Sequence, residues 1–179
     1  QVIALLEHAR NNGAIIYYDV NYRSSHRNEV MKITPNLIDN LEYADIVRGS
    51  REDFEVVYKT DNPDTVYKAE IAFYCKDFIY TNGGENIVLR GKNDFKKEYP
   101  VVQTHTVSTI GAGDNFNAGF IFGLIKNHIT RQMISNGLTE AQWDDLMHYA
   151  TKFSANCCED IYNYISKDFG AQVNLTLNK

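Results

Sequence analysis

The chain has 179 residues, of which 44% are hydrophobic and 23% are charged, and its net charge is −5. A chain of this length and composition can form one globular domain with a buried core. The negative charge and the lack of a long basic run argue against binding to a nucleic acid or to an anionic membrane surface, so we expect neither as a partner.

The three cysteines, Cys75, Cys157 and Cys158, do not form the even, regular set of a disulfide framework. The adjacent pair has no zinc-ligand spacing, and we expect it to pack within a helix. No apolar run is long enough to span a bilayer, and the cytoplasm is the expected location. Because the chain begins at Gln1 and enters a helix at once, we expect that it starts inside a domain.

The first elements predict one unit of a parallel α/β sheet. Apolar positions at helical spacing predict a helix over residues 1–11, and a buried strand follows over residues 14–18. The polar loop after this strand contains Asp19, Asn21 and Arg23. Ligands of parallel sheets bind beyond the carboxyl ends of the strands, which makes these side chains candidates for substrate contacts. A solvated loop with a structural Asp–Arg pair explains them equally well.

The next elements continue the alternation of helices and strands. Pro35 is expected to begin a short helix, and residues 44–48 are expected to form the second strand. Ser50 is then expected to cap a helix over residues 51–59, with Asp53 at its third position. The simplest explanation of this serine and this aspartate is a helix N-terminus.

The middle of the chain predicts a strand followed by a hairpin. A helix around residues 63–75 is expected to lead into a third strand over residues 78–81. The sequence Asn-Gly-Gly-Glu-Asn at 82–86 predicts a turn, and residues 87–103 predict an antiparallel hairpin. Gly83 in the turn is a candidate for contact with a phosphate or a ribose, although such glycines more often only form the turn.

Two long helices and one weak strand are predicted for the rest of the chain. The helices are expected over residues 112–127 and 139–163, and the tail at 172–177 alternates weakly like an edge strand. The whole pattern predicts a single α/β unit with a mostly parallel sheet and one antiparallel excursion.

The glycine turn before the first long helix is the most informative feature. Gly111, Ala112 and Gly113 lead into this helix, with Asp114 in its first turn. The free N–H groups of such a helix start bind an anion. A site for phosphate alone would avoid a carboxylate there, whereas a site that also removes a proton from an attacking hydroxyl needs one. The residues therefore favour a small-molecule kinase over a plain turn whose acidic residue suits the helix dipole.

Other phosphate-binding motifs do not fit this turn. The dinucleotide fingerprint requires a third glycine where this chain has Phe116, and Asp114 would face the pyrophosphate. A Walker A loop requires Gly-Lys followed by Ser or Thr, which is absent. A dehydrogenase-type nucleotide domain is therefore disfavoured.

Several segments together resemble the ribokinase-like (PfkB) family of carbohydrate kinases. The run from Ser108 to Asp114 resembles the family signature D-T-x-G-A-G-D. Further matches occur in the family's order: D-x-N-x-R at 19–23, the A-D strand and capped helix at 44–53, T-x-G at 81–83 and the closing helix at 155–156. These matches span nearly the whole chain.

The resemblance implies a Rossmann-like three-layer α/β/α sandwich of the ribokinase type, with the N-terminal part and the lid missing. Residues 1–179 would be the C-terminal, nucleotide-binding portion of one domain. Such a protein transfers the γ-phosphate of ATP to a sugar hydroxyl. Asp114 would take the hydroxyl proton, and the N–H groups of Ala112, Gly113 and Asp114 next to Gly111 would form the anion hole.

The resemblance also implies where ATP would bind. The nucleotide would lie between the turn of Thr81 and Gly83, the turn of Gly113 and the region of Asn156, with Ser50 as a further contact. Relatives often pair through the missing lid, so the resemblance also allows a homodimer of the full-length protein.

The sugar and the metal are implied in the same way. Asp19, Asn21 and Arg23 would contact the sugar together with Asp114, and Arg23 favours a fructose-like sugar or a keto-deoxy sugar acid. Mg²⁺ would bridge the phosphates mainly through water, with Asp53 near it.

Three positions depart from the family pattern. Ser108 replaces the aspartate that in relatives helps to hold a monovalent cation, so potassium activation stays open. Ser50 and Asp53 replace the asparagine and glutamate of the N-x-x-E motif. These departures support an alternative hypothesis, a non-catalytic relative that binds a nucleotide or a sugar in a regulatory role.

Overall fold

The structure is a computed structural model that describes residues 1–22 and 29–177, and all of their side chains except those of residues 175–177. The chain forms two compact units. The first unit contains residues 1–100 and 130–137, and the second contains residues 101–129 and 138–179. Segment 130–137 thus belongs to the first unit, although its neighbours in sequence on both sides belong to the second.

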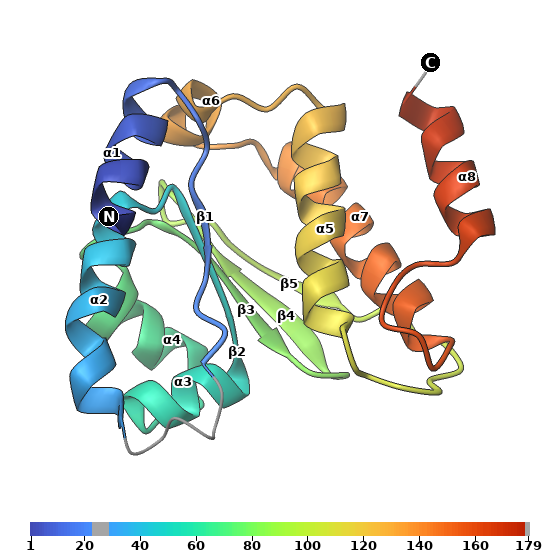
Figure 1. Ribbon diagram of the computed structural model, residues 1–179, viewed down its shortest axis with the longest axis horizontal. Coiled ribbons are helices and arrows are strands. Elements are labelled where there is room, and N and C mark those ends of the chain that lie inside the picture. Colours follow the sequence, from blue (N-terminus) through green and yellow to red (C-terminus); the bar gives the residue numbers. More distant parts are fainter. Residues whose placement is uncertain (23–28, 178–179) are drawn as a thin grey trace. The chain divides into compact units, whose positions relative to one another are not determined.

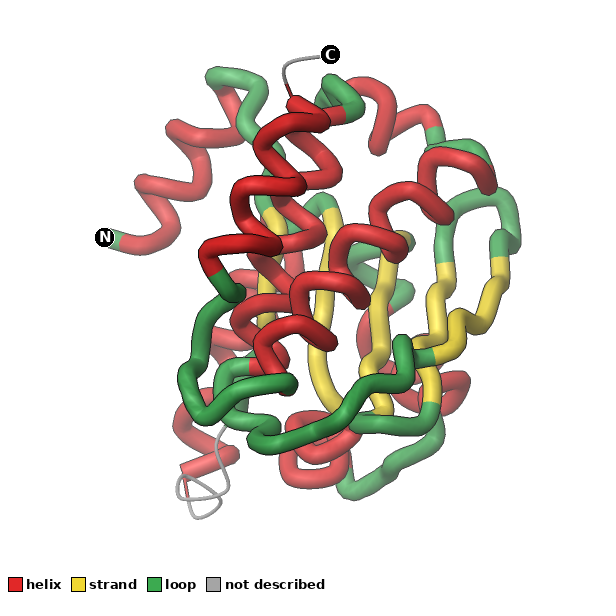
Figure 2. The backbone as a smooth tube through the Cα atoms, turned by 90° about the vertical axis from the view of Figure 1, so that its right-hand side faces the viewer, coloured by secondary structure: helices red, strands yellow, loops and turns green. Residues whose placement is uncertain are grey.

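A five-stranded sheet is the centre of the first unit, and its strands lie side by side in chain order (Figures 1 and 2). The strands are β1 Tyr17–Asp19, β2 Ile46–Ser50, β3 Asp77–Asn82, β4 Asn86–Arg90 and β5 Lys96–Pro100. The first three run parallel, whereas β4 and β5 each run antiparallel to the strand before them. The predicted α/β class and the antiparallel excursion are confirmed. The sheet is mixed rather than mostly parallel, because two of its four strand pairings are antiparallel.

Helices and a buried core accompany this sheet. The helices are α1 Val2–Asn11, α2 Val30–Tyr43, α3 Arg51–Tyr58, α4 Pro63–Val66, its π-helical continuation η2 Tyr67–Ile71, and α6 Arg131–Asn136. Side chains of α2, α3, α4 and η2 form one apolar cluster with alternate residues of the strands. Phe54 of α3 lies at its centre and contacts Phe78 and Tyr80 of β3, with ring centroids 5.4 and 5.7 Å apart. Burial of this apolar surface is the main force that holds α2 and α3 to the sheet.

The prediction that Pro35 begins a helix is wrong. Helix α2 begins at Val30, and Pro35 lies inside it. Val30 and Ile33 line the same small cavity as Leu37, so the apolar stripe of the helix extends toward its N-terminus beyond the proline. Packing of this stripe outweighs the backbone hydrogen bond that proline cannot donate.

Helix α6 was not predicted. It has 6 residues, and the hydroxyl of Thr130 caps it by accepting a hydrogen bond from the Met133 N–H at 3.3 Å. A helix this short has too few positions to show a hydrophobic period, so its cap is its only sequence signal.

Three helices form the second unit: α5 Ala112–Lys126, α7 Glu140–Cys158 and α8 Lys167–Leu177. Helices α5 and α7 pack closely because α5 has glycines where they meet. A Cβ on Gly119 would lie 2.8 Å from Phe153 Cβ and 2.9 Å from Ala150 Cα, closer than packed atoms approach. The absence of a side chain at Gly119 therefore allows the two helices to approach this closely.

The end of the chain differs from its prediction. Helix α7 ends at Cys158 rather than near residue 163, and the tail predicted as an edge strand is helix α8. The hydroxyl of Ser166 accepts a hydrogen bond from the Phe169 N–H at 3.2 Å, which starts α8. The Phe169 ring also packs edge-on against Phe153 of α7, with centroids 5.2 Å apart. A cap and one tertiary contact thus outweigh the weak alternation of the tail.

Cys157 and Cys158 are buried in α7, which confirms their expected packing role. None of the helices in the described part of the chain combines the length and the apolar character needed to cross a bilayer.

Candidate functional site

A buried arginine connects three strands of the first unit. Arg48 of β2 is 7% exposed and lies opposite Asp19 in the register of β1 and β2. Its Nη1 donates to both carboxylate oxygens of Asp19, at 3.1 and 3.2 Å, and its Nη2 donates to Thr81 Oγ1 at 2.9 Å. The Asp19 carboxylate is thus held in an ion pair with Arg48 within the sheet. The other predicted partner, Arg23, lies outside the described residues.

Ser50 and Asp53 form the capping box of α3, which confirms the simplest interpretation of these residues. Asp53 is 6% exposed. Its Oδ2 accepts hydrogen bonds from the Ser50 N–H at 2.7 Å and from the Ser50 hydroxyl at 2.6 Å, and its Oδ1 accepts one from the Tyr22 N–H at 2.6 Å. Both carboxylate oxygens therefore hold the start of α3 and the segment after β1 in place.

The turn after β3 leaves its glycines open. Before this turn, the Thr81 hydroxyl accepts a hydrogen bond from Arg48 and donates one to the Gly49 carbonyl at 3.4 Å, so it is directed toward β2. In the turn itself, Gly83 has φ +53°, and no atom lies within 4 Å of the place where its Cβ would be. Asn21, at the end of the segment after β1, is exposed and has φ +37°, a conformation that asparagine tolerates better than most residues. The turn at Gly83 therefore has open space for a ligand.

In the second unit, the turn at Gly111 can be formed only by glycine. Gly111 has φ +80° and is the N-cap of α5. A Cβ at this position would lie 2.7 Å from Asn163 Cβ and 3.0 Å from the Asn163 carbonyl oxygen. The positive φ and the close approach of the Asn163 backbone both exclude a side chain.

At the start of α5, the backbone N–H groups differ in whether they already donate to a carbonyl of the described residues. The Ala112 N–H donates to the Thr109 carbonyl at 3.2 Å. Within the described residues, the N–H groups of Gly113 and Asp114 donate to no backbone carbonyl, as expected for the first turn of a helix. The side chain of Asp114 is exposed at the third helical position. The turn therefore presents two backbone donors and one carboxylate on the first turn of one helix.

Asn156 anchors the segment that follows α7. Its Oδ1 accepts a hydrogen bond from the Ser166 N–H at 2.8 Å, and its Nδ2 donates to Glu159 at 3.0 Å. The carbonyl of Cys158 accepts from the Val107 N–H at 2.8 Å. The C-terminal end of α7 thus holds both the segment before the Gly111 turn and the segment before α8.

The sequence did not identify Arg48 or Asn115 as site residues. Asn115 joins the Gly111 turn to Asn163 through its side-chain amide. Each residue has a weak signal in the sequence, because Arg48 is a charge within an apolar strand and Asn115 is an amide within an apolar helix. Such polar residues in buried elements need a hydrogen-bond partner, but the sequence does not say which one.

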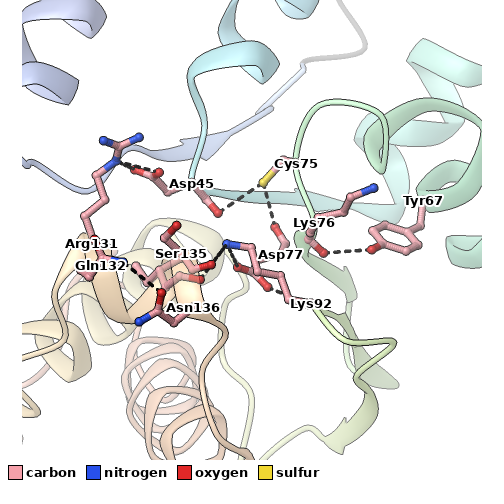
Figure 3. Close-up of polar contacts among 11 residues, drawn as sticks. Asp45, Tyr67, Cys75, Lys76, Asp77, Lys92, Arg131, Gln132, Ser135 and Asn136 are labelled. Carbon is pink, nitrogen blue, oxygen red and sulfur yellow. Dashed lines mark hydrogen bonds and ion pairs between the residues drawn. The ribbon is translucent and has the colours of Figure 1, made fainter.

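A network of ion pairs lies at the opposite end of the sheet, where β2 and β3 begin (Figure 3). Arg131 of α6 donates from Nε to both oxygens of Asp45, at 2.9 and 3.1 Å. Lys92 Nζ donates to two carbonyls at the end of α6, at 2.8 and 3.0 Å, and lies 4.0 Å from Asp77 Oδ2. A cavity of about 480 Å³ opens among these groups. Its charged groups already have partners, so the network serves to hold α6 to the sheet.

Asp77 makes the stability of this network depend on pH. Its side chain is 1% exposed, and burial raises the pKa of Asp77 to about 6, although the nearby Lys92 ammonium lowers it in part. Because the folded protein favours the protonated carboxyl, this residue stabilises the fold fully below about pH 4, and the contribution is lost as pH rises to about 6. We expect wild type to lose roughly 2–3 kcal/mol over this range relative to Asp77→Asn.

Denaturant unfolding of both proteins at several pH values measures this difference. If the gap in unfolding free energy between wild type and Asp77→Asn stays constant from pH 4 to pH 7, the raised pKa is wrong.

The fold, the polar residues at the ends of the parallel strands and the Gly111 turn together indicate the class of protein. A sheet whose parallel strands end in polar side chains, and a glycine turn that starts a helix with free N–H groups, are typical of α/β proteins that bind phosphorylated ligands. The sequence pattern that defines the pfkB family carbohydrate kinases matches residues 1–160. The chain therefore belongs to this family, as its motifs predicted.

Individual relatives agree with this assignment. The chain is 25% identical over 130 residues to 5-dehydro-2-deoxygluconokinase 1 of Bacillus cereus, a match that covers 70% of this chain and 39% of that protein. The chain thus spans well under half the length of this curated relative.

Solved structures show the same fold. The aminoimidazole riboside kinase of Salmonella enterica, solved with aminoimidazole riboside and an ATP analogue, matches with a TM-score of 0.75 and 22% identity, over 98% of this chain and 56% of that chain. The fructokinase of Vibrio cholerae, solved with fructose, ADP and calcium, matches with a TM-score of 0.78 and 17% identity, over 98% of this chain and 55% of that chain. The ribokinase-type α/β fold is therefore confirmed.

Proposed function

We propose that the full-length protein transfers the γ-phosphate of ATP to a hydroxyl of a sugar. The observation that supports this most strongly is the start of α5. There the N–H groups of Gly113 and Asp114 donate to no backbone carbonyl of the described residues, and Asp114 adds an exposed carboxylate. Backbone donors at a helix start stabilise the charge that develops on a transferred phosphoryl group. A carboxylate beside them can accept the proton of the attacking hydroxyl.

In this proposal Asp114 is the general base and the Gly111 turn is the anion hole. The N–H groups of Gly113 and Asp114 are its main donors, because the Ala112 N–H already donates to Thr109 at 3.2 Å. Positioning and charge stabilisation then provide most of the catalysis, as in other phosphoryl transfers.

ATP is proposed to contact the open turn of Thr81 and Gly83, the Gly113 turn and the region of Asn156, with Ser50 nearby. A Mg²⁺ ion bound together with ATP would supply positive charge that offsets the charge of the transferred group. The described residues contain no cluster of three metal-binding side chains, and Asp53 already accepts three hydrogen bonds. The ion would therefore be held mainly by the phosphates and by water, and Asp53 would not be a direct ligand.

For the sugar we propose contacts from Asp19, Asn21, Arg23 and Asp114, and Asp19 is held in its ion pair with Arg48. The proposed substrates are a keto-deoxy sugar acid or a fructose-like ketose. The first is supported by the name of the Bacillus cereus relative and the second by the fructose in the Vibrio cholerae structure. Residues 1–179 would be the nucleotide-binding portion of this kinase, and the cytoplasm is the proposed location.

The test is ADP release by the full-length protein with magnesium ATP and a panel of ketoses, sugar acids and nucleosides. Sugar-dependent release is expected, with the largest rate for a ketose or a keto-deoxy acid. A sugar-independent rate for every compound would contradict the proposal.

One observation favours the alternative, a non-catalytic regulatory relative. The carboxylate of Asp53 is buried and committed to the capping box, which leaves it little freedom to serve a metal. Binding of ATP without ADP release from any sugar would support this alternative.

A further inference from the structure

The residue after the proposed base is buried and fully engaged as a donor. Asn115 is 8% exposed, although it is an amide within an apolar helix. Its Nδ2 donates to the carbonyl of Gly111 at 2.9 Å and to the carbonyl of Asn163 at 3.0 Å. Both hydrogens of the amide group are therefore used.

These bonds join two segments that are far apart in sequence. The Gly111 carbonyl also accepts the backbone N–H of Asn115 at 2.9 Å, so two donors from one residue hold its peptide plane. Asn163 lies in segment 159–166, between α7 and α8, and its backbone packs directly against Gly111. Because peptide planes are rigid, holding this carbonyl limits the directions in which the next N–H groups can point.

We propose that Asn115 is a positioning residue for phosphoryl transfer. Its amide locks the Gly111 turn onto segment 159–166 and thereby keeps the N–H groups of Gly113 and Asp114 aimed at the transferred phosphoryl group. This inference rests on the proposed function. A misplacement of about 1 Å in such a site lowers the rate on the order of 10²-fold.

Two substitutions separate the hydrogen bonds from the shape of the side chain. Asn115→Asp keeps the shape but turns a carboxylate oxygen toward two carbonyl oxygens. Asn115→Ser retains one donor. The matched control is Asn12→Asp, because Asn12 is an exposed amide that also donates to a backbone carbonyl, that of His8 at 2.8 Å.

The first measurement is kcat and KM of the full-length variants with the best sugar. We expect Asn115→Asp to lower kcat about 10²-fold with KM for the sugar within about twofold, and Asn115→Ser to recover part of the loss. The ratio of Asn115→Asp activity to wild-type activity should rise as pH falls, because a protonated carboxyl can donate again. Asn12→Asp should match wild type. An Asn115→Asp variant that is only less stable, with unchanged kcat for the folded enzyme, would overturn the proposal.

A second measurement does not depend on turnover. Hydrogen–deuterium exchange of full-length Asn115→Asp should increase together in the peptides that contain residues 108–116 and 159–166, and stay unchanged elsewhere. Unchanged exchange in either segment would contradict the proposal that Asn115 connects the Gly111 turn to segment 159–166. If wild type has no kinase activity, the proposed function fails, and this measurement still decides whether Asn115 joins the two segments.

Discussion

Replacing Asp114 with asparagine is expected to lower kcat of the full-length protein about 10³-fold while ATP affinity stays within about twofold. Asparagine keeps the size of the side chain but cannot accept the proton of the attacking hydroxyl. Asp114 is exposed at the third position of α5, so a side chain of the same size should leave the packing of the helix unchanged. Steady-state ADP release and calorimetric titration with ATP measure the two quantities.

Asp168 provides the matched control for this variant. It is also an exposed aspartate in the first turn of a helix of the second unit, and no role in the reaction is proposed for it. Asp168→Asn should retain wild-type kcat. Near-wild-type turnover of Asp114→Asn would refute the role of Asp114 as the base, and a loss shared by both variants would point to a general effect of charge.

The second large effect is expected for Gly111→Ala. Alanine would have to adopt φ +80°, and its Cβ would overlap the backbone of Asn163. The left-handed conformation costs about 1–2 kcal/mol and steric overlap about 1–3 kcal/mol, so we expect a total loss of roughly 2–5 kcal/mol in unfolding free energy. Because segment 159–166 cannot move without breaking its bonds to the turn, kinase activity should also fall by at least about tenfold.

Gly84→Ala is the control, because no atom lies within 4 Å of its added Cβ and its φ is not positive. Thermal or denaturant unfolding of both variants gives the comparison. Equal stabilities for Gly111→Ala and Gly84→Ala would show that the Gly111 turn is not constrained as described.

Much of the first unit could be predicted because its signals are local. The strands around residues 46–50 and 77–82 are apolar runs bounded by turn residues, and Ser50 indicates the start of the helix that follows. The start of α2 could not be predicted in the same way, because the packing of Val30 decides it rather than the preference of Pro35 for a first turn. Likewise, the Ser166 cap and the contact of Phe169 make the tail helical against its own pattern.

In the candidate site, too, local features could be predicted from the sequence, whereas contacts between distant residues could not. The Gly111 turn is visible in the sequence because its glycines and Asp114 are neighbours. The pair of Arg48 with Asp19 joins residues 29 positions apart, and the bond from Asn115 to Asn163 joins residues 48 positions apart. Such partners depend on strand register and on the packing of loops, which no local pattern records.

The most direct test of the central claim is to follow the γ-phosphate itself. The full-length protein is incubated with magnesium ATP and the sugar that gives the highest ADP release, and the phosphorus signals are recorded by NMR spectroscopy. The account predicts a new sugar phosphomonoester in an amount equal to the ADP formed, with none from Asp114→Asn. Inorganic phosphate in place of the phosphomonoester, or bound ATP that no sugar converts, would contradict it.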